Sequence, residues 1–278
     1  MTDAPDSPDA AAAADFTTLE PAPQDWIDLA CRLADIARPI ARRHFRQPLE
    51  IIAKADESPV TIADRAIEAA MREEIEAVFP DHGIYGEEYG QVRTDAEVVW
   101  VLDPIDGTQS FISGVPLFGT LIAACRNGRP VVGVIDQPIL EERWLGAAGR
   151  TTTFQNEPVA TSGCEDPAEA TLFSTHPDMF AARGLEAPFA QLAGSVRRTR
   201  YGIDCYAYGL VAAGWAELVV ETNLQPYDFC AIAPVIEGAG GAVSDWTGAP
   251  LSIASDGSVV AAATPALNVA ARGLLTHG

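Results

Sequence analysis

The chain has 278 residues, 48% of them hydrophobic, so it can bury a substantial core as one large domain or two small ones. With 39 acidic and 18 basic residues its formal net charge is −21, and the resulting field repels nucleic acid and anionic lipid. Its uncharged apolar stretches are far shorter than the roughly 20 residues that span a bilayer. We therefore expect neither nucleic acid nor a membrane as a partner.

Residues 1–22 contain hardly any large apolar side chain and cannot offset the entropy of becoming ordered. We expect them to form a disordered acidic tail before a folded domain at 23–278. The first residues are acidic where a secretory signal would be basic, which favours a cytoplasmic protein. The five cysteines are odd in number and form no CxxC pair, so we expect reduced thiols and no zinc site.

Two amphipathic helices are predicted in the first part of the chain. From Asp25, the expected N-cap, apolar residues recur at helical spacing. Pro39 is expected to kink this helix or to mark its boundary. A second helix is predicted over Ile62–Phe79, ended by Pro80.

Four strands follow and predict an antiparallel meander. The first, Val98–Asp103, is rich in β-branched residues and closes on Pro104, which indicates a buried strand that enters a turn. Turn signals at Asn127-Gly128 and Gln137-Pro138 separate the other three. Those strands are expected at Gly119–Cys125, Val131–Ile135 and Arg143–Ala147.

The second half of the chain changes to alternating strands and helices. Helices are predicted at Cys205–Ala213 and Asp228–Gly238, and strands at Ala216–Glu221 and Ala242–Asp245. The turn Gly238–Gly241 is interpreted as a helix C-cap that leads into a strand. The fold class is therefore layered α+β, with an antiparallel sheet in a subdomain at about 23–150 and a mixed sheet in a subdomain at 151–278.

The segment Asp103–Phe111, DPIDGTQSF, carries the most informative chemical pattern. One strand-end turn can offer a hard divalent cation the carboxylates of Asp103 and Asp106 and the carbonyl of Ile105. Gly107 and Thr108 would open a helix and present unsatisfied N–H groups to a phosphate. Taken alone, the segment is equally consistent with an acidic turn that caps a helix.

Two further acidic motifs lie at predicted element boundaries. Glu87 and Glu88 follow the second helix, and Asp228 opens a later one. If the three motifs converge, their mutual repulsion requires cations between them. Two metals roughly 3.5 to 4 Å apart would clamp the attacking and leaving oxygens of a phosphoryl displacement, so the pattern predicts phosphate hydrolysis.

In this order the motifs resemble the inositol-monophosphatase-like superfamily, from about Asp25 to the C-terminus. The residues that carry the resemblance are Glu87-Glu88, Asp103-Pro104-Ile105-Asp106-Gly107-Thr108, Asp228, Gly238–Gly241 and the earlier segment Ser58–Asp64. The resemblance implies a layered α-β-α-β-α sandwich, Mg²⁺ as cofactor, a small-molecule phosphate monoester as substrate and a homodimer. Tyr227 stands where the family often has tryptophan, and Gln109-Ser110 where inositol monophosphatases typically have Thr-Asn.

The resemblance also assigns roles, residue by residue. The first Mg²⁺ would be bound by Glu87, Asp103 and the Ile105 carbonyl, and the second by Asp103, Asp106 and Asp228. A third, weaker ion would lie near Glu87. Thr108 and Glu87 would orient the attacking water, with Asp64 assisting nearby. Because the metal lowers the pKa of that water, no covalent phosphoenzyme is needed.

Several segments look more like the histidinol-phosphatase branch than the inositol branch. They are Gly107–Ile112, Pro116–Thr120, Ile135–Ile139, Glu142–Gly146 and Asp204–Gly209. Histidinol phosphate has an ammonium and an imidazole opposite its phosphate, and carboxylates at Asp204 and Glu221 would favour that cation over a neutral polyol. Gly107 and Thr108 would contact the phosphate, and Gln109 would bear on the choice of substrate. A competing interpretation makes Asp204 the N-cap of the following helix.

The predicted reaction is the hydrolysis of L-histidinol phosphate to L-histidinol and phosphate, a step of histidine biosynthesis. One alternative is an inositol-1-phosphatase or a broad-specificity small-molecule phosphatase. Another is a catalytically silent regulator that binds metal or phosphate on the same scaffold. A silent scaffold would normally have lost a ligand or the water-orienting threonine, and all of these residues are present in the chain: Glu87, Asp103, Asp106, Thr108 and Asp228.

Overall fold

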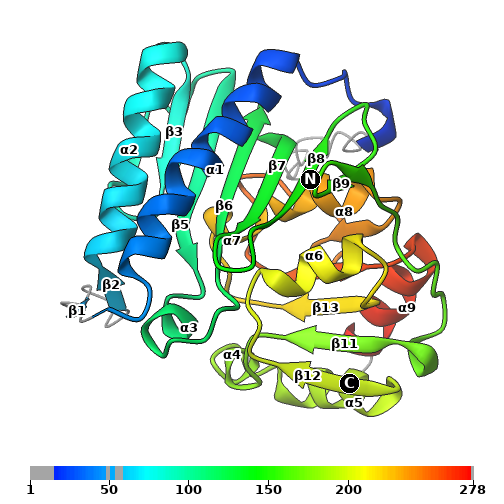
Figure 1. Cartoon of the computed structure of the whole chain (residues 1–278). Coiled ribbons are helices and arrows are strands. Elements are labelled where there is room, and N and C mark those ends of the chain that lie inside the picture. Colours follow the sequence, from blue (N-terminus) through cyan, green and yellow to red (C-terminus); the bar gives the residue numbers. More distant parts are fainter. Residues whose placement is uncertain (1–15, 48–50, 54–58, 277–278) are drawn as a thin grey trace, which may run out of the picture.

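The computed structural model describes the backbone of residues 16–47, 51–53 and 59–276 and the side chains of residues 16–47 and 62–275. Helices α1 (Gln24–His44) and α2 (Ile62–Val78) cover one face of an eight-stranded sheet (Figure 1). A middle layer contains α6 (Tyr206–Ala212), α7 (Pro226–Phe229) and α8 (Ile232–Gly238). It separates the first sheet from a five-stranded sheet, whose outer face is covered by α5 (Glu186–Ser195) and α9 (Pro265–Thr276). The expected α-β-α-β-α sandwich is confirmed.

The eight-stranded sheet contains the predicted meander. Its order is β10-β9-β8-β7-β6-β5-β3-β4, and its neighbours are antiparallel except for the parallel pair β3 and β5. The strands are β3 (Gly83–Gly86), β4 (Gln91–Val92), β5 (Val98–Asp106), β6 (Gly119–Arg126), β7 (Arg129–Gln137), β8 (Glu142–Ala147), β9 (Thr153–Phe154) and β10 (Glu157–Pro158). Strand β5 continues beyond its predicted end, so that it contains the whole Asp103–Asp106 segment.

The five-stranded sheet is mixed, as expected. Its order is β12-β11-β13-β15-β14, with β11 parallel to β12 and β13, and β15 antiparallel to β13 and β14. The strands are β11 (Thr171–Ser174), β12 (Arg198–Tyr201), β13 (Leu218–Glu221), β14 (Ala242–Ser244) and β15 (Val259–Ala262). The helix predicted over Asp228–Gly238 is two helices, α7 and α8. Pro234 lacks the N–H that a continuous helix would donate to the Cys230 carbonyl, which explains the break.

Successive residues of one strand enter different cores, because strand side chains point alternately to the two faces of a sheet. In β5, Trp100 packs with α1 and α2, whereas Val101 packs with the middle layer. In β13, Val219 packs with the middle layer and Val220 with α5 and α9. Both sheets are therefore covered on both faces, and the middle helices are shared between them.

The start of the domain needs two corrections. Phe16 is 7% exposed and Ala22 5% exposed, and the Ala22 N–H donates to the Ala148 carbonyl at 3.0 Å, so packed structure begins before residue 23. Residues 1–15 of the predicted tail lie outside the described residues. Asp25 is not an N-cap, because α1 begins at Gln24 with Pro23 in the cap position, and Pro39 lies inside the helix without ending it.

Short elements complete the chain, and all five cysteines are free thiols, as expected. These elements are η1 (Phe16–Thr18), β1 (Ile51–Ala53), β2 (Pro59–Thr61), α3 (Thr108–Ile112), η2 (Pro167–Glu169) and α4 (Asp178–Ala181).

Close packing of α8 on the first sheet depends on a pair of glycines. Gly133 of β7 and Gly146 of β8 are cross-strand partners. A Cβ at Gly133 would collide with the carbonyl oxygen of Ala231, and one at Gly146 with that of Pro234. The helix can approach the sheet this closely only because both side chains are absent.

We expect Gly133→Ala to lower the free energy of unfolding by about 1–3 kcal/mol, because the added methyl group overpacks the interface between β7 and α8. Gly194→Ala in α5 is the control, since no heavy atom of the described residues outside its own helix and its chain neighbours lies within 4 Å of the added Cβ. It should be neutral or stabilise the fold by up to about 1 kcal/mol. Urea denaturation of the two variants measures both values, and equal effects would contradict the packing argument.

Candidate active site

The two carboxylates of the Asp103–Asp106 segment lie at the end of β5, inside the first sheet. On a regular strand, residues three apart point to opposite faces. The register of β5 against β6 shifts between Asp103 and Asp106, and such an irregularity redirects side chains. This local break in the strand allows both carboxylates to reach one centre.

Asp228 joins this centre from α7. Its carboxylate accepts a hydrogen bond from the backbone N–H of Gln225 at 2.7 Å, as part of a capping box at the start of the helix. One ligand oxygen from each of Asp103, Asp106 and Asp228 lies within 4.8 Å of the other two. Two of the three acidic motifs of the sequence thus form one tight cluster.

Burial makes this cluster costly without a counter-charge. Asp103 is 2% exposed, and burial, followed by the charge of Glu87, raises its pKa well above the usual value. Burial also raises the pKa of Asp106, to which the charge of Asp204 adds, and raises that of Asp228 to about 7. The Oδ1 atom of Asp103 is a buried acceptor with no hydrogen-bond partner among the described residues. Crowded carboxylates and an unused acceptor fit a hard divalent cation such as Mg²⁺.

Glu87 and Asp64 lie close to this cluster without belonging to its tight group of three. Glu87 follows β3, and its N–H donates to the Leu102 carbonyl at 3.3 Å, so its backbone lies beside Asp103. Asp64 is in the first turn of α2 and is 1% exposed. The charges of both residues raise the pKa of Asp103, which places them around the same centre.

The turn after β5 has the predicted form. Gly107 has φ +87° and precedes α3, and a side chain there would meet the Asp204 carboxylate at 2.7 Å. The Thr108 hydroxyl donates to the carbonyl of Ile105 at 3.2 Å, so the two predicted site residues are in contact. Gln109 is exposed on the first turn of α3.

Asp204 is bound to this turn and does not cap a helix. Cys205, not Asp204, occupies the cap position of α6, and no side chain caps that helix. The Ser110 hydroxyl donates to Oδ2 of Asp204 at 2.6 Å, and the Cys205 N–H donates to Oδ2 of Asp106 at 2.7 Å. Burial raises the pKa of Asp204. The start of α6 therefore contacts both the cluster and the turn of α3.

Glu221 ends β13 and has two donors of its own. Its carboxylate accepts from the Thr175 N–H and from the Tyr208 hydroxyl, each at 2.7 Å, and its side chain is only 3% exposed. Burial raises the pKa of Glu221. Its charge adds to the rise in the pKa of Asp228, so Glu221 borders the same centre while it joins β11, β13 and α6.

The segments that resemble the histidinol-phosphatase branch mainly make packing contacts. Gln137 donates to the Pro116 carbonyl at 2.7 Å and to that of Phe118 at 3.2 Å, which holds the connection before β6. The Tyr206 hydroxyl donates to Glu142 at 2.8 Å. Gly209 lies against the ring of the fully buried Trp144, where a side chain would collide with the indole. The contacts of Tyr206 and Gly209 hold α6 against β8.

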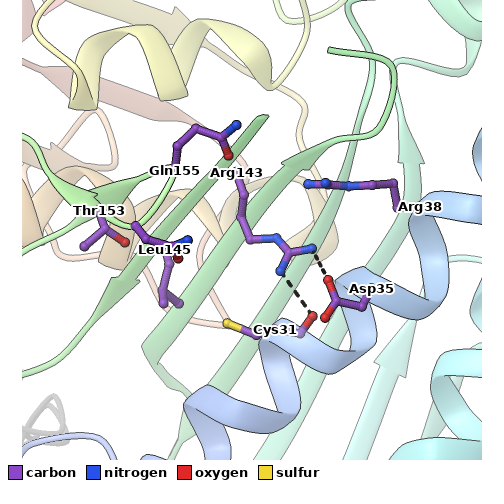
Figure 2. Close-up of a pocket in the computed structure, with 8 residues that line it drawn as sticks. Cys31, Asp35, Arg38, Arg143, Leu145, Thr153 and Gln155 are labelled. Atoms are coloured by element: carbon purple, nitrogen blue, oxygen red, sulfur yellow. Dashed lines mark hydrogen bonds and ion pairs between the residues drawn. The ribbon is translucent and has the colours of Figure 1, made fainter. Parts of the chain in front are cut away.

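A pocket of about 160 Å³ lies between α1 and β8, away from the carboxylate cluster (Figure 2). Figure 2 shows Arg143 joined to Asp35 and to the backbone carbonyl of Cys31, at 2.7 and 3.4 Å. Both Arg143 and Arg38 also bind the fully buried Asp136. These charges neutralise one another, so we interpret the group as a structural link between helix and sheet.

Two features of the site were not predicted from the sequence: the buried Glu68 and the contact of Asp204 with Ser110. Glu68 is fully buried on α2 although it is ionisable. Its position on the buried face, with Asp64, Ile67, Met71 and Ile75 at helical spacing, was the available signal. The contact of Asp204 with Ser110 spans 94 positions of the chain, and no local pattern indicates it.

Comparison with known proteins agrees with this geometry. Residues 22–276 match the model of the inositol monophosphatase family. The chloroplastic bifunctional phosphatase IMPL2 of Arabidopsis thaliana is 47% identical over 243 residues, which are 87% of this chain and 69% of the relative. The histidinol-phosphatase of Chlorobaculum parvum is 36% identical over 236 residues, which are 84% of this chain and 91% of the relative.

Comparison with solved structures also indicates the fold of an inositol monophosphatase. An inositol monophosphatase from Zymomonas mobilis superposes with a TM-score of 0.83 at 47% identity, covering 91% of this chain and 98% of that one. Fold and carboxylate cluster together define a phosphatase that acts on small phosphate esters. The chain belongs to the inositol monophosphatase family. None of the helices in the described part of the chain has both the length and the apolar composition of a bilayer span.

In the metal-free protein we expect the melting temperature to fall as pH rises from about 5 to 7. The pKa of Asp228 rises on folding from 3.8 to about 7, so at intermediate pH the folded state holds a proton that the unfolded state has lost. The bound proton adds to the free energy of unfolding at low pH, and this added stability is lost as the pH rises through the folded-state pKa of Asp228. Mg²⁺ should reduce this fall, because a bound cation replaces the proton.

Thermal melts in EDTA and in Mg²⁺ across this pH range measure the effect. The matched control is Asp228→Asn, which should show a weaker fall in EDTA and a smaller shift with Mg²⁺. A wild-type melting temperature that stays constant or rises with pH in EDTA would contradict the prediction.

Proposed function

We propose that this protein is a Mg²⁺-dependent phosphatase that hydrolyses L-histidinol phosphate to L-histidinol and phosphate. The observation that carries the proposal is the cluster of Asp103, Asp106 and Asp228, with Asp204 beside it on the turn of α3. The cluster requires cations to offset its negative charge, and these cations would also bind a phosphate. Asp204 adds a carboxylate where the rest of a cationic substrate would lie. The relative from Chlorobaculum parvum named histidinol-phosphatase supports the same substrate.

The proposed ligands of the first ion are Glu87, Asp103 and the Ile105 carbonyl, and those of the second are Asp103, Asp106 and Asp228. A third ion would bind near Glu87. When bound, Mg²⁺ neutralises phosphate charge and lowers the pKa of the attacking water. The residues themselves supply oxygen ligands in a fixed arrangement, since β5, α7 and the segment after β3 hold them from three directions.

Thr108 and Glu87 would orient the attacking water, with Asp64 assisting. The Thr108 hydroxyl donates to the Ile105 carbonyl at 3.2 Å, so its oxygen lone pairs remain able to accept a hydrogen bond from the water. Backbone N–H groups at Gly107, Thr108 and Gln109 open a short helix, where the first-turn amides lack intrahelical acceptors and would bind phosphate oxygens. The water and the phosphate would thus be held by one turn of the chain.

Asp204 and Glu221 would bind the cationic end of the substrate. Each already accepts at least one hydrogen bond, which fixes its orientation before substrate arrives. A carboxylate oxygen has two lone pairs, so an occupied carboxylate can still accept from an ammonium or imidazolium group. A neutral polyol would gain less from these charges than a cation would.

A second candidate is hydrolysis of inositol 1-phosphate or of a broader set of phosphate esters. It is favoured by the similarity to the inositol monophosphatase from Zymomonas mobilis and to the relative from Arabidopsis thaliana, which is named a bifunctional phosphatase. A silent metal- or phosphate-binding regulator is the non-enzymatic candidate. The cluster of Asp103, Asp106 and Asp228, together with Thr108, favours an active site over this third possibility.

The proposal is tested by kcat/KM for phosphate release from histidinol phosphate and from inositol 1-phosphate, each with Mg²⁺ and with EDTA. We expect turnover only with Mg²⁺ and a preference for histidinol phosphate of about tenfold or more, the ratio that roughly 1.4 kcal/mol of differential binding produces. Preference for inositol 1-phosphate would keep the metal chemistry but refute the substrate. No turnover of either ester would leave the regulator as the better explanation.

The role of Asp204 is tested by Asp204→Asn. Asparagine keeps the shape and can still accept from Ser110, but it removes the charge that would pair with the substrate. We expect KM for histidinol phosphate to rise about tenfold or more, because a charge-assisted hydrogen bond contributes roughly 1.5–3 kcal/mol. KM for inositol 1-phosphate should change little and serves as the internal control. An unchanged KM for histidinol phosphate would show that Asp204 does not contact the substrate.

A further inference from the structure

Glu68 is an ionisable side chain with no exposed surface, on the inner face of α2. Helix α2 lies at the edge of the first layer, beside β3 (Figure 1). Glu68 is four residues after Asp64, so one face of the helix carries both carboxylates. Burying a carboxylate this completely is unfavourable unless hydrogen bonds or an opposite charge compensate for the lost hydration.

The carboxylate of Glu68 accepts three hydrogen bonds, and two of them come from the segment that carries Glu87. The N–H of Glu88 donates to Oε2 at 2.6 Å, and the N–H of Tyr89 donates to Oε1 at 3.1 Å. The third donor is the Arg72 guanidinium, whose Nε lies 2.7 Å from Oε1. Arg72 also donates to the carbonyl of Gly90. Glu68 and Arg72 therefore bind residues 88–90 from the helix.

The remaining contacts of residues 86–90 leave Glu87 little freedom. The Gly86 N–H donates to the Gly90 carbonyl at 3.0 Å, and the Glu87 N–H donates to the Leu102 carbonyl of β5 at 3.3 Å. A side chain at Gly86 would collide with the Glu68 carboxylate, so the segment passes directly over that carboxylate. Glu87 is thus held by β5 through its own amide and by α2 through the next two.

We infer that Glu68 is a positioning residue that holds Glu87 at the carboxylate cluster and thereby sets the affinity of the site for Mg²⁺. The inference rests on the proposed function, in which Glu87 is a metal ligand. Residues that hold a metal ligand in place typically change metal affinity about 10–100-fold when they are replaced.

A carboxylate is required because of the number and kind of its donors. Two backbone amides and a guanidinium all donate, and a carboxylate has two acceptor oxygens with about four lone-pair sites for them. A glutamine at this position would offer one acceptor oxygen and would turn an NH₂ group toward another donor. An ordinary ion pair between residues four apart on a helix surface forms without hydrogen bonds from a second segment of the chain.

The test is Glu68→Gln in the full chain, with Mg²⁺ binding measured by calorimetry in the absence of substrate. We expect the Kd for Mg²⁺ and the Mg²⁺ concentration for half-maximal activity to rise about tenfold or more. The kcat at saturating Mg²⁺ should stay within about threefold of the wild type, since excess cation restores the occupied site. A purely structural role would lower the melting temperature without this split between Mg²⁺ affinity and kcat.

The matched control is Glu74→Gln on the same helix. Glu74 pairs with Arg32 at 3.0 Å, on the more exposed part of α2, and the change should leave the affinity for Mg²⁺ unaltered. If Glu68→Gln does not fold, Arg72→Lys replaces it, because lysine keeps the charge but loses the planar contacts with Glu68 and Gly90. We expect that variant to bind Mg²⁺ about threefold or more weakly than the wild type.

Wild-type affinity for Mg²⁺ in a folded Glu68→Gln protein, or in Arg72→Lys where the first does not fold, would overturn this inference alone. A wild-type protein that binds no Mg²⁺ would overturn the inference together with the proposed function. A wild type that binds Mg²⁺ and hydrolyses phosphate esters, beside a variant with weakened binding, would support both.

Discussion

The main physical constraint on the site is the electrostatic repulsion among three carboxylates that the fold brings close together. Asp103, Asp106 and Asp228 have ligand oxygens within 4.8 Å of one another, and like charges this close repel strongly where water is excluded. The groups that hold Asp106 and Asp228 are neutral backbone amides, from Cys205 and Gln225. Compensation must therefore come from protons or from cations. The raised pKa values and the fit to Mg²⁺ are two results of this one constraint.

Such a cluster persists only if the elements around it are firmly packed, and the layered fold provides this on both faces of β5. On one face, α2 contributes Asp64 and, through Glu68, fixes the segment that carries Glu87. On the other face, the middle layer contributes Asp228 from α7 and the start of α6. One core lies between β5 and the helices α1 and α2, and another lies between β5 and the middle layer. Because β5 contributes to both, the stability of both cores supports the arrangement of the carboxylates.

The substrate side of the site depends on α6. Its first residues bind Asp106, its Tyr208 binds Glu221, and its Tyr206 binds Glu142 of β8. Two of the segments that resemble the histidinol-phosphatase branch, Glu142–Gly146 and Asp204–Gly209, contact each other and thereby place this helix and Asp204. Preference for a cationic substrate would then follow from the location of one carboxylate and its hydrogen bond from Ser110.

The sequence by itself determined the features that local chemistry controls. Runs of β-branched residues between turn signals located β5 to β8, and both carboxylates of the Asp103–Asp106 segment lie within four residues of one strand end. Only the tertiary structure decided which distant groups meet. The Asp136 carboxylate takes one of its two arginines from a helix 98 positions away, and Glu68 takes its amides from residues 20 and 21 positions away. Phe16 is buried by packing with α1 and the eight-stranded sheet. The physical reason is that local periodicity specifies which face of an element is apolar, whereas the partner of a buried charge is set by how separate elements pack.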